Sequence, residues 1–221
     1  MKKYIIIVTM LFAACSAPKS TDRLLAEVWQ SDQQVRRQII ELTKAVTTEG
    51  RTDLIDSLIM VCELQESVDA RNISIIDSLL QDGVPNSLSK ESYKTIWIVI
   101  DHSTLEKQLL YLPIVEQMAT DGLIDKDEYA TLFDRVAMGQ KRPQRYGSQS
   151  VQFGRPEAMQ LYIYPVENSE KLDSLRATVG MEPIAEYLKV LTQTTGIEAQ
   201  FDRQMTIDCL EKLRNGEQKR D

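Results

Sequence analysis

One stretch of the sequence, Ile96 to Ile100, is apolar at five consecutive positions inside a longer helical pattern. A helix that is apolar on every side has to be buried, so other helices must surround it. The flanking sequence supplies them, because apolar residues recur at helical spacing from Leu24 to Leu42 and from Leu54 to Leu64. The pattern predicts a helical bundle around the segment 89–122, with a kink or local break at Pro113.

The helical pattern is interrupted once. From Tyr146 to Val166 there is no helical period, and the sequence VQF, a Gly-Arg-Pro turn and the sequence LYIY are typical of a β-hairpin. Helical patterns resume near Glu170 and recur in the sequences PIAEYLKVLTQ and FDRQMTIDCLEKLR. The sequence therefore predicts a mainly α, single-domain helical bundle with a small β-hairpin inserted near residues 147–165.

The N-terminus has the features of an export signal. Lys2 and Lys3 precede an apolar run that is shorter than the roughly 20 residues needed to span a bilayer. Ala13, Ala14 and Cys15 resemble the lipobox of bacterial lipoproteins, in which the cysteine is acylated after export. We expect a signal peptide over 1–14, a lipidated Cys15 with a tether over 15–20, and one domain over 21–216. An ordinary cleaved signal that happens to end in cysteine is the alternative.

These features predict a lipoprotein held at a membrane by its acyl chains and facing the periplasm. The segment after Cys15 lacks the acidic cluster that resembles a surface-export signal. Removing residues 1–14 deletes two lysines and moves the formal charge from −7 to −9. A chain this acidic is not expected to bind nucleic acid. The sequence does not say whether its partner is a protein or a small molecule.

Neither a metal nor a cofactor is expected. One histidine and scattered cysteines do not supply a zinc site. The segment DGLIDKDEY imitates half of a calcium loop, but Gln117 and Ala119 stand where acidic ligands are required. Cys62 and Cys209 lie in helical patterns, where they either pair in the oxidising periplasm or remain buried free thiols.

The only histidine, His102, directly follows the apolar run and lies one helical turn before Glu106. An imidazole beside a carboxylate can serve as a general base. The alternative is a core histidine that hydrogen-bonds a backbone carbonyl or Glu106. His102 is therefore the candidate catalytic residue.

Several short polar segments occur in the same order as in a known bacterial family. They are DQQVR (32–36), DARN (69–72), DGVP (82–85), DH (101–102), DR (134–135), QRYGSQ (144–149), YPVEN (164–168) and DSLRATVGMEPIAEYL (173–188). Together they resemble a bacterial domain of unknown function that has a Gln-x-Tyr-Gly-Thr-Gln signature. Ser148 stands for the usual threonine, and Asp101 for the glutamine common before the histidine. The resemblance spans nearly the whole mature chain and implies no activity.

The matched polar positions give a candidate binding site. Its expected members are Arg36, Asp69, Asn72, Arg135, Gln144, Tyr146, Ser148 and Gln149. We expect the loop 144–149 to fold over the helices and to direct its two glutamine amides toward His102 and Arg135. A buried hydrogen-bond network that only holds the loop in place is the competing interpretation.

Three functions are consistent with the sequence. The first is binding of a small anionic ligand, or of an acidic group on a partner, because Arg36, Arg135 and Arg145 suit carboxylate or phosphate. The second is a hydrolase-like enzyme with His102 as general base and Ser148 or a water as nucleophile. The third is a structural or scaffolding lipoprotein without a pocket, for which a broad exposed apolar patch would be evidence.

Overall fold

The computed structural model describes residues 20–154 and 159–215. The expected signal peptide, Cys15 and most of the tether therefore lie outside the described residues, as does part of the Gly-Arg-Pro turn. Within the described ranges, no helix is long and apolar enough to cross a membrane.

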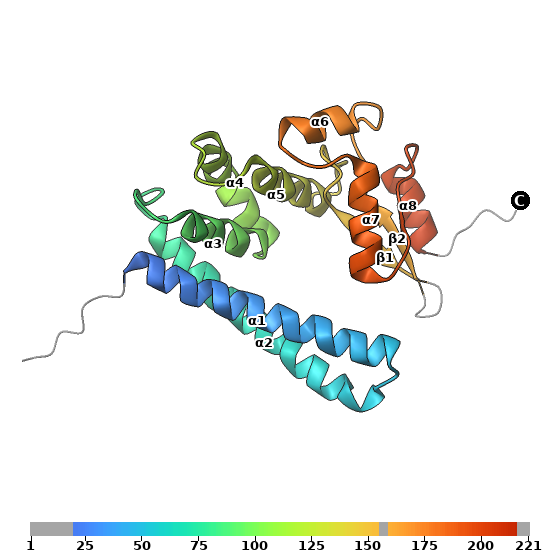
Figure 1. The fold of residues 1–221 in the computed structure, drawn as a ribbon, viewed down its shortest axis with the longest axis horizontal. Coiled ribbons are helices and arrows are strands. Elements are labelled where there is room, and N and C mark those ends of the chain that lie inside the picture. The colour runs from blue at the N-terminus through green and yellow to red at the C-terminus, as the bar shows by residue number, and fades with distance from the viewer. Residues whose placement is uncertain (1–19, 155–158, 216–221) are drawn as a thin grey trace, which may run out of the picture.

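The first two helices form a long antiparallel hairpin (Figure 1). They are α1 (Thr21–Thr48) and α2 (Ile55–Leu79), joined through a short 3-10 helix, η1 (Thr52–Leu54). The connection turns at Gly50, whose φ of 68° lies in the left-handed region that glycine adopts without a steric penalty. Ser20 caps α1 by accepting a hydrogen bond from the backbone N–H of Arg23.

The next three helices form a layer over the base of this hairpin, and the first of them makes most of the contacts with it. They are α3 (Lys90–Asp101), α4 (Leu105–Thr120) and α5 (Lys126–Gly139). As its apolar run predicts, α3 is the central one: Ile96 and Ile100 are fully buried, and α3 contacts α1, α2, α4 and α5. The main core lies here, where residues of α1 and α2 meet α3 and α4.

The break in the 89–122 segment is not at Pro113. It occurs at His102 to Thr104, where Thr104 caps α4 by accepting from the backbone N–H of Lys107. Pro113 lies inside α4. α3 thus ends at Asp101, about three helical turns before the proline, and the hydroxyl of Thr104 caps the new helix. Asp125 and Glu128 form a capping box at the start of α5.

The C-terminal part contains the predicted hairpin and three short helices. The strands are β1 (Ser150–Phe153), β2 (Gln160–Ile163) and β3 (Ala199–Gln200), and the helices are α6 (Leu172–Thr178), α7 (Ile184–Thr195) and α8 (Ile207–Arg214). β1 and β2 pair antiparallel, as expected for the predicted hairpin, and the structure sets Ser150 opposite Ile163. The two-residue strand β3 adds to β2 in parallel, which the sequence pattern did not indicate. Two small apolar clusters pack α6, α7 and α8 against the sheet.

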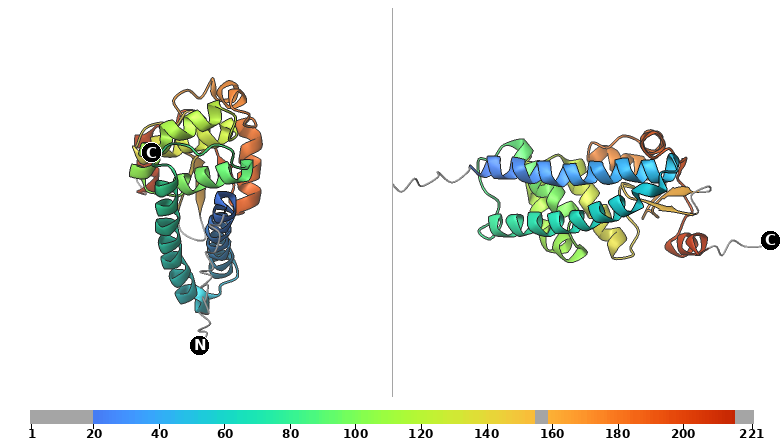
Figure 2. Two further views of the ribbon diagram at one scale, coloured as in Figure 1. Left: turned by 90° about the vertical axis from the view of Figure 1, so that its left-hand side faces the viewer. Right: turned by 90° about the horizontal axis from the view of Figure 1, so that it is seen from below.

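The two views of Figure 2 show how these parts are arranged. The base of the α1–α2 hairpin is covered by the α3–α5 layer, whereas its outer end extends beyond that layer (Figures 1 and 2). Cys62 and Cys209 lie on α2 and α8, and both thiols are free and exposed. The structure therefore corrects the expectation of buried thiols, and no bond joins the two.

Candidate functional site

A buried carboxylate, Asp32, lies where α1, α2 and α3 meet. Its side chain is 1% exposed, and its carboxylate lies 3.1 Å from Nδ1 of His102 and 3.2 Å from the guanidinium of Arg36. It also accepts a hydrogen bond of 2.8 Å from the side-chain amide of Gln33. A buried charge is tolerated only when it is paired and hydrogen-bonded, and Asp32 meets both conditions.

Asp32 was not among the expected site residues, although a signal for it exists in the sequence. It lies between Val28 and Val35 on the apolar stripe of α1, four residues from the first and three from the second. An aspartate on a stripe of buried valines needs a partner from another element. That partner is His102, which is 70 positions away in the chain.

His102 is the C-cap residue of α3, at the break before α4. Its side chain is 18% exposed, so it is partly accessible from solvent. Because Nδ1 contacts Asp32, Nε2 is the ring nitrogen left for another partner. The expected pairing of His102 with Glu106 is replaced by this contact.

Arg36 connects the two helices of the hairpin. It contacts Asp32 on its own helix and donates to both carboxylate oxygens of Asp69 on α2, at 3.0 and 3.1 Å. Two carboxylates therefore share one guanidinium. The formal charges of Asp32, Arg36 and Asp69 sum to −1.

Asn72 completes this side of the site. It is fully buried on α2, and its side-chain oxygen accepts a weak hydrogen bond of 3.4 Å from the hydroxyl of Ser31. Its amide nitrogen has no hydrogen-bond partner among the described residues. A buried N–H group without an acceptor is costly, so this donor is suited to a further polar group. The contacts of Asp32 and Arg36 join four residues, Asp32, Arg36, Asp69 and His102, which we call the His102 cluster.

Arg135 belongs to a separate ion pair. Its Nε donates to Asp101 across 2.8 Å, which joins α5 to α3. The Asp101 side chain is 3% exposed and that of Arg135 is 35% exposed. The aspartate that replaces the usual glutamine before the histidine therefore has a charged partner in this chain.

The loop 144–149 folds around Asp134, the neighbour of Arg135. Asp134 is fully buried and accepts from the backbone N–H groups of Arg145, Tyr146 and Ser148 and from the hydroxyl of Ser148, all within 2.8–3.2 Å. Burial raises the pKa of Asp134, and these hydrogen bonds act in the opposite direction. Gly147 has a φ of 65°, which allows three neighbouring N–H groups to converge on one carboxylate.

The two glutamines of the loop bind the loop itself, not His102 or Arg135 as expected. Gln144 is fully buried; its oxygen accepts from the backbone of Gln149, and its amide donates to the carbonyls of Gln149 and Tyr164. The amide of Gln149 donates to the carbonyl of Thr131 and to the hydroxyl of Ser148. These bonds attach the loop to α5 and to the end of β2.

Two further residues hold the loop from the C-terminal side. Arg176 of α6 is 3% exposed and donates to the carbonyls of Tyr146, Gly147 and Glu182. Burial lowers the pKa of Arg176. Tyr187 of α7 donates to the carbonyl of Ser148 across 2.7 Å. Neither residue was singled out from the sequence, since isolated polar residues in short helices carry no pattern.

The expected site residues thus fall into three groups. Arg36 and Asp69 are linked to His102 through Asp32, Asn72 lies one helical turn from Asp69 on α2, and Arg135 pairs with Asp101. Gln144, Tyr146, Ser148 and Gln149 form the loop around Asp134. Each arginine of the anion hypothesis has an acidic partner, since Arg145 also contacts Glu167 at 3.4 Å. The three guanidinium groups do not converge on one site.

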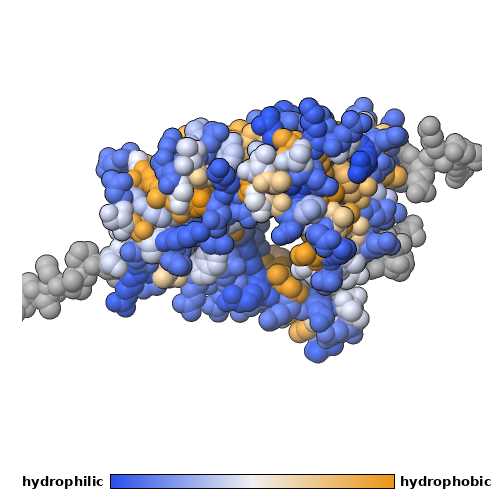
Figure 3. All heavy atoms as spheres, turned by 45° about the horizontal axis from the view of Figure 1, so that its top comes forward, coloured by the Kyte–Doolittle hydropathy of each residue, from blue (hydrophilic) through white to orange (hydrophobic). Residues whose placement is uncertain are grey.

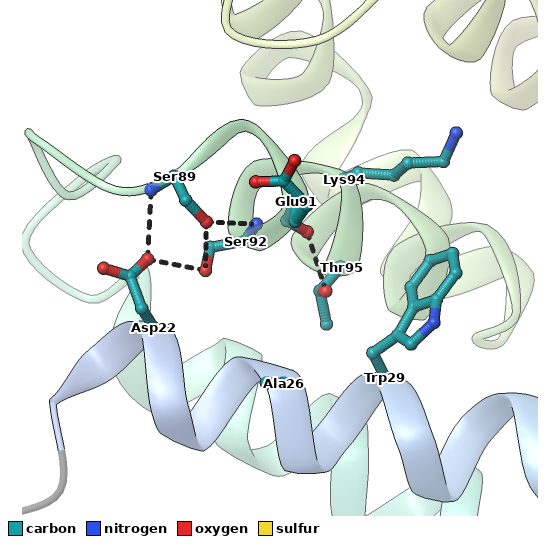
Figure 4. A pocket seen from close by; sticks show the side chains of 8 residues that line it. All are labelled: Asp22, Ala26, Trp29, Ser89, Glu91, Ser92, Lys94 and Thr95. Carbon is teal, nitrogen blue, oxygen red and sulfur yellow. Dashed lines mark hydrogen bonds between the residues drawn. The ribbon is translucent and has the colours of Figure 1, made fainter.

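A hollow of about 470 Å³ lies elsewhere, between α1 and the start of α3 (Figure 4). It is lined by Asp22, Ala26, Trp29, Ser89, Glu91, Ser92, Lys94 and Thr95. Asp22 accepts from the backbone N–H of Ser89 and from the hydroxyl of Ser92, and Ser89 in turn caps α3. None of the residues expected to form a site lines this hollow.

The fold and the buried polar groups define a mainly helical domain with one solvent-accessible histidine cluster and one closed loop network. Residues 18–200 match the model of a family described as "Family of unknown function (DUF6624)", and the chain belongs to this family. Comparison with curated proteins gave no match, and comparison with solved structures gave none.

Proposed function

We propose that this protein is a lipid-anchored component of the bacterial envelope that faces the periplasm and binds a small polar ligand at His102. The observation that carries the ligand site is the contact of 3.1 Å between Nδ1 of His102 and the buried carboxylate of Asp32. A carboxylate held in this way orients the ring and selects which nitrogen meets a ligand. The buried amide of Asn72, one helical turn from Asp69 on α2, is a further donor near this cluster.

The charge of the cluster changes the expected ligand. Asp32 and Asp69 outnumber Arg36, so an anion would meet a site that is already negative. A neutral hydrogen-bonding ligand or a cation is favoured instead. The small anionic ligand suggested by the three arginines loses its basis, because each of these arginines is paired with a carboxylate.

Nuclear magnetic resonance of the single histidine tests this site. Signals of a His-labelled chain starting at Ser20 would be followed during titration with sets of neutral polar, cationic and anionic small molecules. We expect saturable shifts of the His102 ring signals with neutral or cationic compounds, and binding at least tenfold weaker in His102→Gln. Lys141→Gln, a change at an exposed lysine outside the cluster, serves as the control. Binding of anions alone, or binding of a compound that leaves the His102 signals unchanged, would contradict the proposal.

The anchor is tested separately with the full-length chain. We expect Cys15→Ser to move the protein from the membrane fraction to the soluble fraction of the envelope, because acyl chains supply the membrane affinity. Cys62→Ser, which removes an exposed thiol of the domain, should leave the protein in the membrane fraction. Retention of Cys15→Ser in the membrane would show that something other than lipid holds the protein there.

Hydrolysis is the second candidate, and the same pair of Asp32 and His102 favours it. A carboxylate that orients a histidine is the arrangement of a general base. Ser148 does not suit the role of nucleophile, because its hydroxyl donates to Asp134 and not to His102. A water molecule activated by Nε2 would have to take that role, and turnover lost in Asp32→Asn together with His102→Gln would support catalysis.

A further inference from the structure

Within residues 20–154 and 159–215, no third layer covers the outer end of the α1–α2 hairpin. Val35 is the last buried residue of α1, and Asn72 is the first buried residue of α2. Between them, the two helices contact each other, and every residue is at least partly exposed. Two helices with nothing packed over them leave any outward apolar side chain in water.

Large apolar side chains occur on this end of the hairpin. Their exposed fractions are 67% for Ile40, 42% for Ile55, 52% for Ile59, 69% for Met60 and 49% for Leu64. Figure 3 shows the surface hollowed between the hairpin end and the C-terminal part, with apolar side chains visible beside the hollow. Such a concentration of apolar residues on a small domain is typical of an interaction surface.

Helical spacing places three of these residues on one face. Ile55 and Ile59 share a stripe of α2 with Asp69. The stripe runs through positions 55, 59, 62, 66 and 69, at alternating intervals of four and three residues. Asp69 contacts Arg36, and Ile40 lies one turn beyond Arg36 on α1. Ile40, Ile55 and Ile59 therefore continue outward from the Arg36–Asp69 ion pair. We call these three residues the hairpin face.

Met60 and Leu64 lie elsewhere on α2. At about 100° per residue, they are rotated by about 100° and 140° from Ile59. They are as exposed as the hairpin face but do not share it. They provide a matched control for any binding to that face.

The charge around the hairpin face is acidic. Residues 37–66 contain three basic residues (Arg37, Lys44 and Arg51) and six acidic ones (Glu41, Glu49, Asp53, Asp56, Glu63 and Glu66). The formal net charge of this end is −3. One of the basic residues, Arg51, is already paired with Asp53. A partner that carries positive charge beside its apolar residues would be complementary.

We propose that the hairpin face docks an amphipathic helix of a partner protein whose apolar side is flanked by lysine and arginine. Apolar residues at intervals of three and four on the partner would lie across Ile40, Ile55 and Ile59 and complete a three-helix layer. The basic flanks would face the acidic residues of the hairpin end. This surface is independent of the His102 cluster and does not require a ligand there.

Two other occupants fit less well. A second copy of the chain would bring two ends of charge −3 together, which repel each other. An anionic membrane surface would repel the same end. In addition, α1 has 28 residues and is therefore about 42 Å long, so the end lies far from a lipid on Cys15 if α1 points away from the membrane.

The experiment uses the chain from Ser20 and two fluorescent 18-residue helical peptides at about 0.15 M salt. One peptide has a leucine face flanked by lysines, and the other has the same leucines flanked by glutamates. We expect one-to-one binding of the lysine peptide and at least tenfold weaker binding of the glutamate peptide. Ile55→Gln together with Ile59→Gln should weaken the lysine peptide by at least tenfold. Met60→Gln together with Leu64→Gln should change it less than about threefold.

Three other results would overturn the proposal. Equal weakening by both double variants would mean that charge alone attracts the peptide. A dimer of the wild-type chain that Ile59→Gln disrupts, without peptide binding, would identify a second copy as the occupant. Binding to anionic vesicles in place of the peptide would identify a lipid surface. Circular dichroism of each variant verifies that the helices are intact.

Discussion

Asp134→Ala is expected to lower the free energy of unfolding by roughly 3 to 6 kcal/mol. A buried donor left without a partner costs about 1 to 3 kcal/mol, and water reduces this cost for the partly buried donors of Arg145 and Ser148. The carboxylate accepts from three backbone N–H groups and one hydroxyl of the loop 144–149. A loss of this size is a large part of the stability of a typical domain. Urea unfolding followed by circular dichroism measures it.

Two comparisons make this prediction specific. Asp134→Asn keeps one acceptor oxygen and should lose less than Asp134→Ala. Arg142→Gln changes an exposed residue just before the loop, and we expect it to cost less than about 0.5 kcal/mol. If Asp134→Ala and Arg142→Gln unfold at the same urea concentration, the loop does not depend on the carboxylate.

Arg135→Met is expected to lower the free energy of unfolding by about 3 kcal/mol, because it leaves the buried carboxylate of Asp101 without its charged partner. Most of this cost comes from the unpaired charge of Asp101, whose side chain is 3% exposed. The loss of Arg135 itself costs less, because its side chain is partly exposed. Thermal or urea unfolding of the chain from Ser20 measures the change.

A double-mutant cycle separates the ion pair from other roles of Arg135. Combining Asp101→Asn with Arg135→Met should cost less than the sum of the two single changes. The reason is that the double variant contains no unpaired buried charge, whereas Arg135→Met alone leaves one at Asp101. Additive effects would mean that the two side chains stabilise the fold independently. A stable Arg135→Met chain that no longer binds small molecules would instead assign Arg135 to a ligand site.

Much of the fold was predictable because it depends on local patterns. The apolar run from Ile96 to Ile100 indicated the buried helix α3, and the sequences VQF and LYIY around a Gly-Arg-Pro turn indicated the hairpin of β1 and β2. The pair Asp125 and Glu128 is a local helix-start pattern, and α5 begins there. The break at His102 was missed, because Pro113 is the stronger local signal and yet is accommodated within α4.

The site was predictable only in part. Arg36, Asp69 and His102 were all expected, and the structure places them in one cluster. Asp32, which contacts both Arg36 and His102, was not singled out, although it lies on an apolar stripe. Asp134 was also not singled out, although it lies on a buried stripe of α5, four residues after Ala130 and three before Ala137. Carboxylates at such positions indicate buried polar contacts, but not which residue makes them.

The sequence by itself determined the helical periodicity, the place of the strands, the acidic charge and the candidate residues, because these follow from the order of side chains along the chain. Only the tertiary structure decided that His102 meets Asp32 and not Glu106, and that the loop 144–149 folds around Asp134 and not Arg135. It also left the hairpin face uncovered. Hydrogen bonds and ion pairs act over about 3 to 4 Å, and helix packing alone brings residues 70 positions apart within that distance.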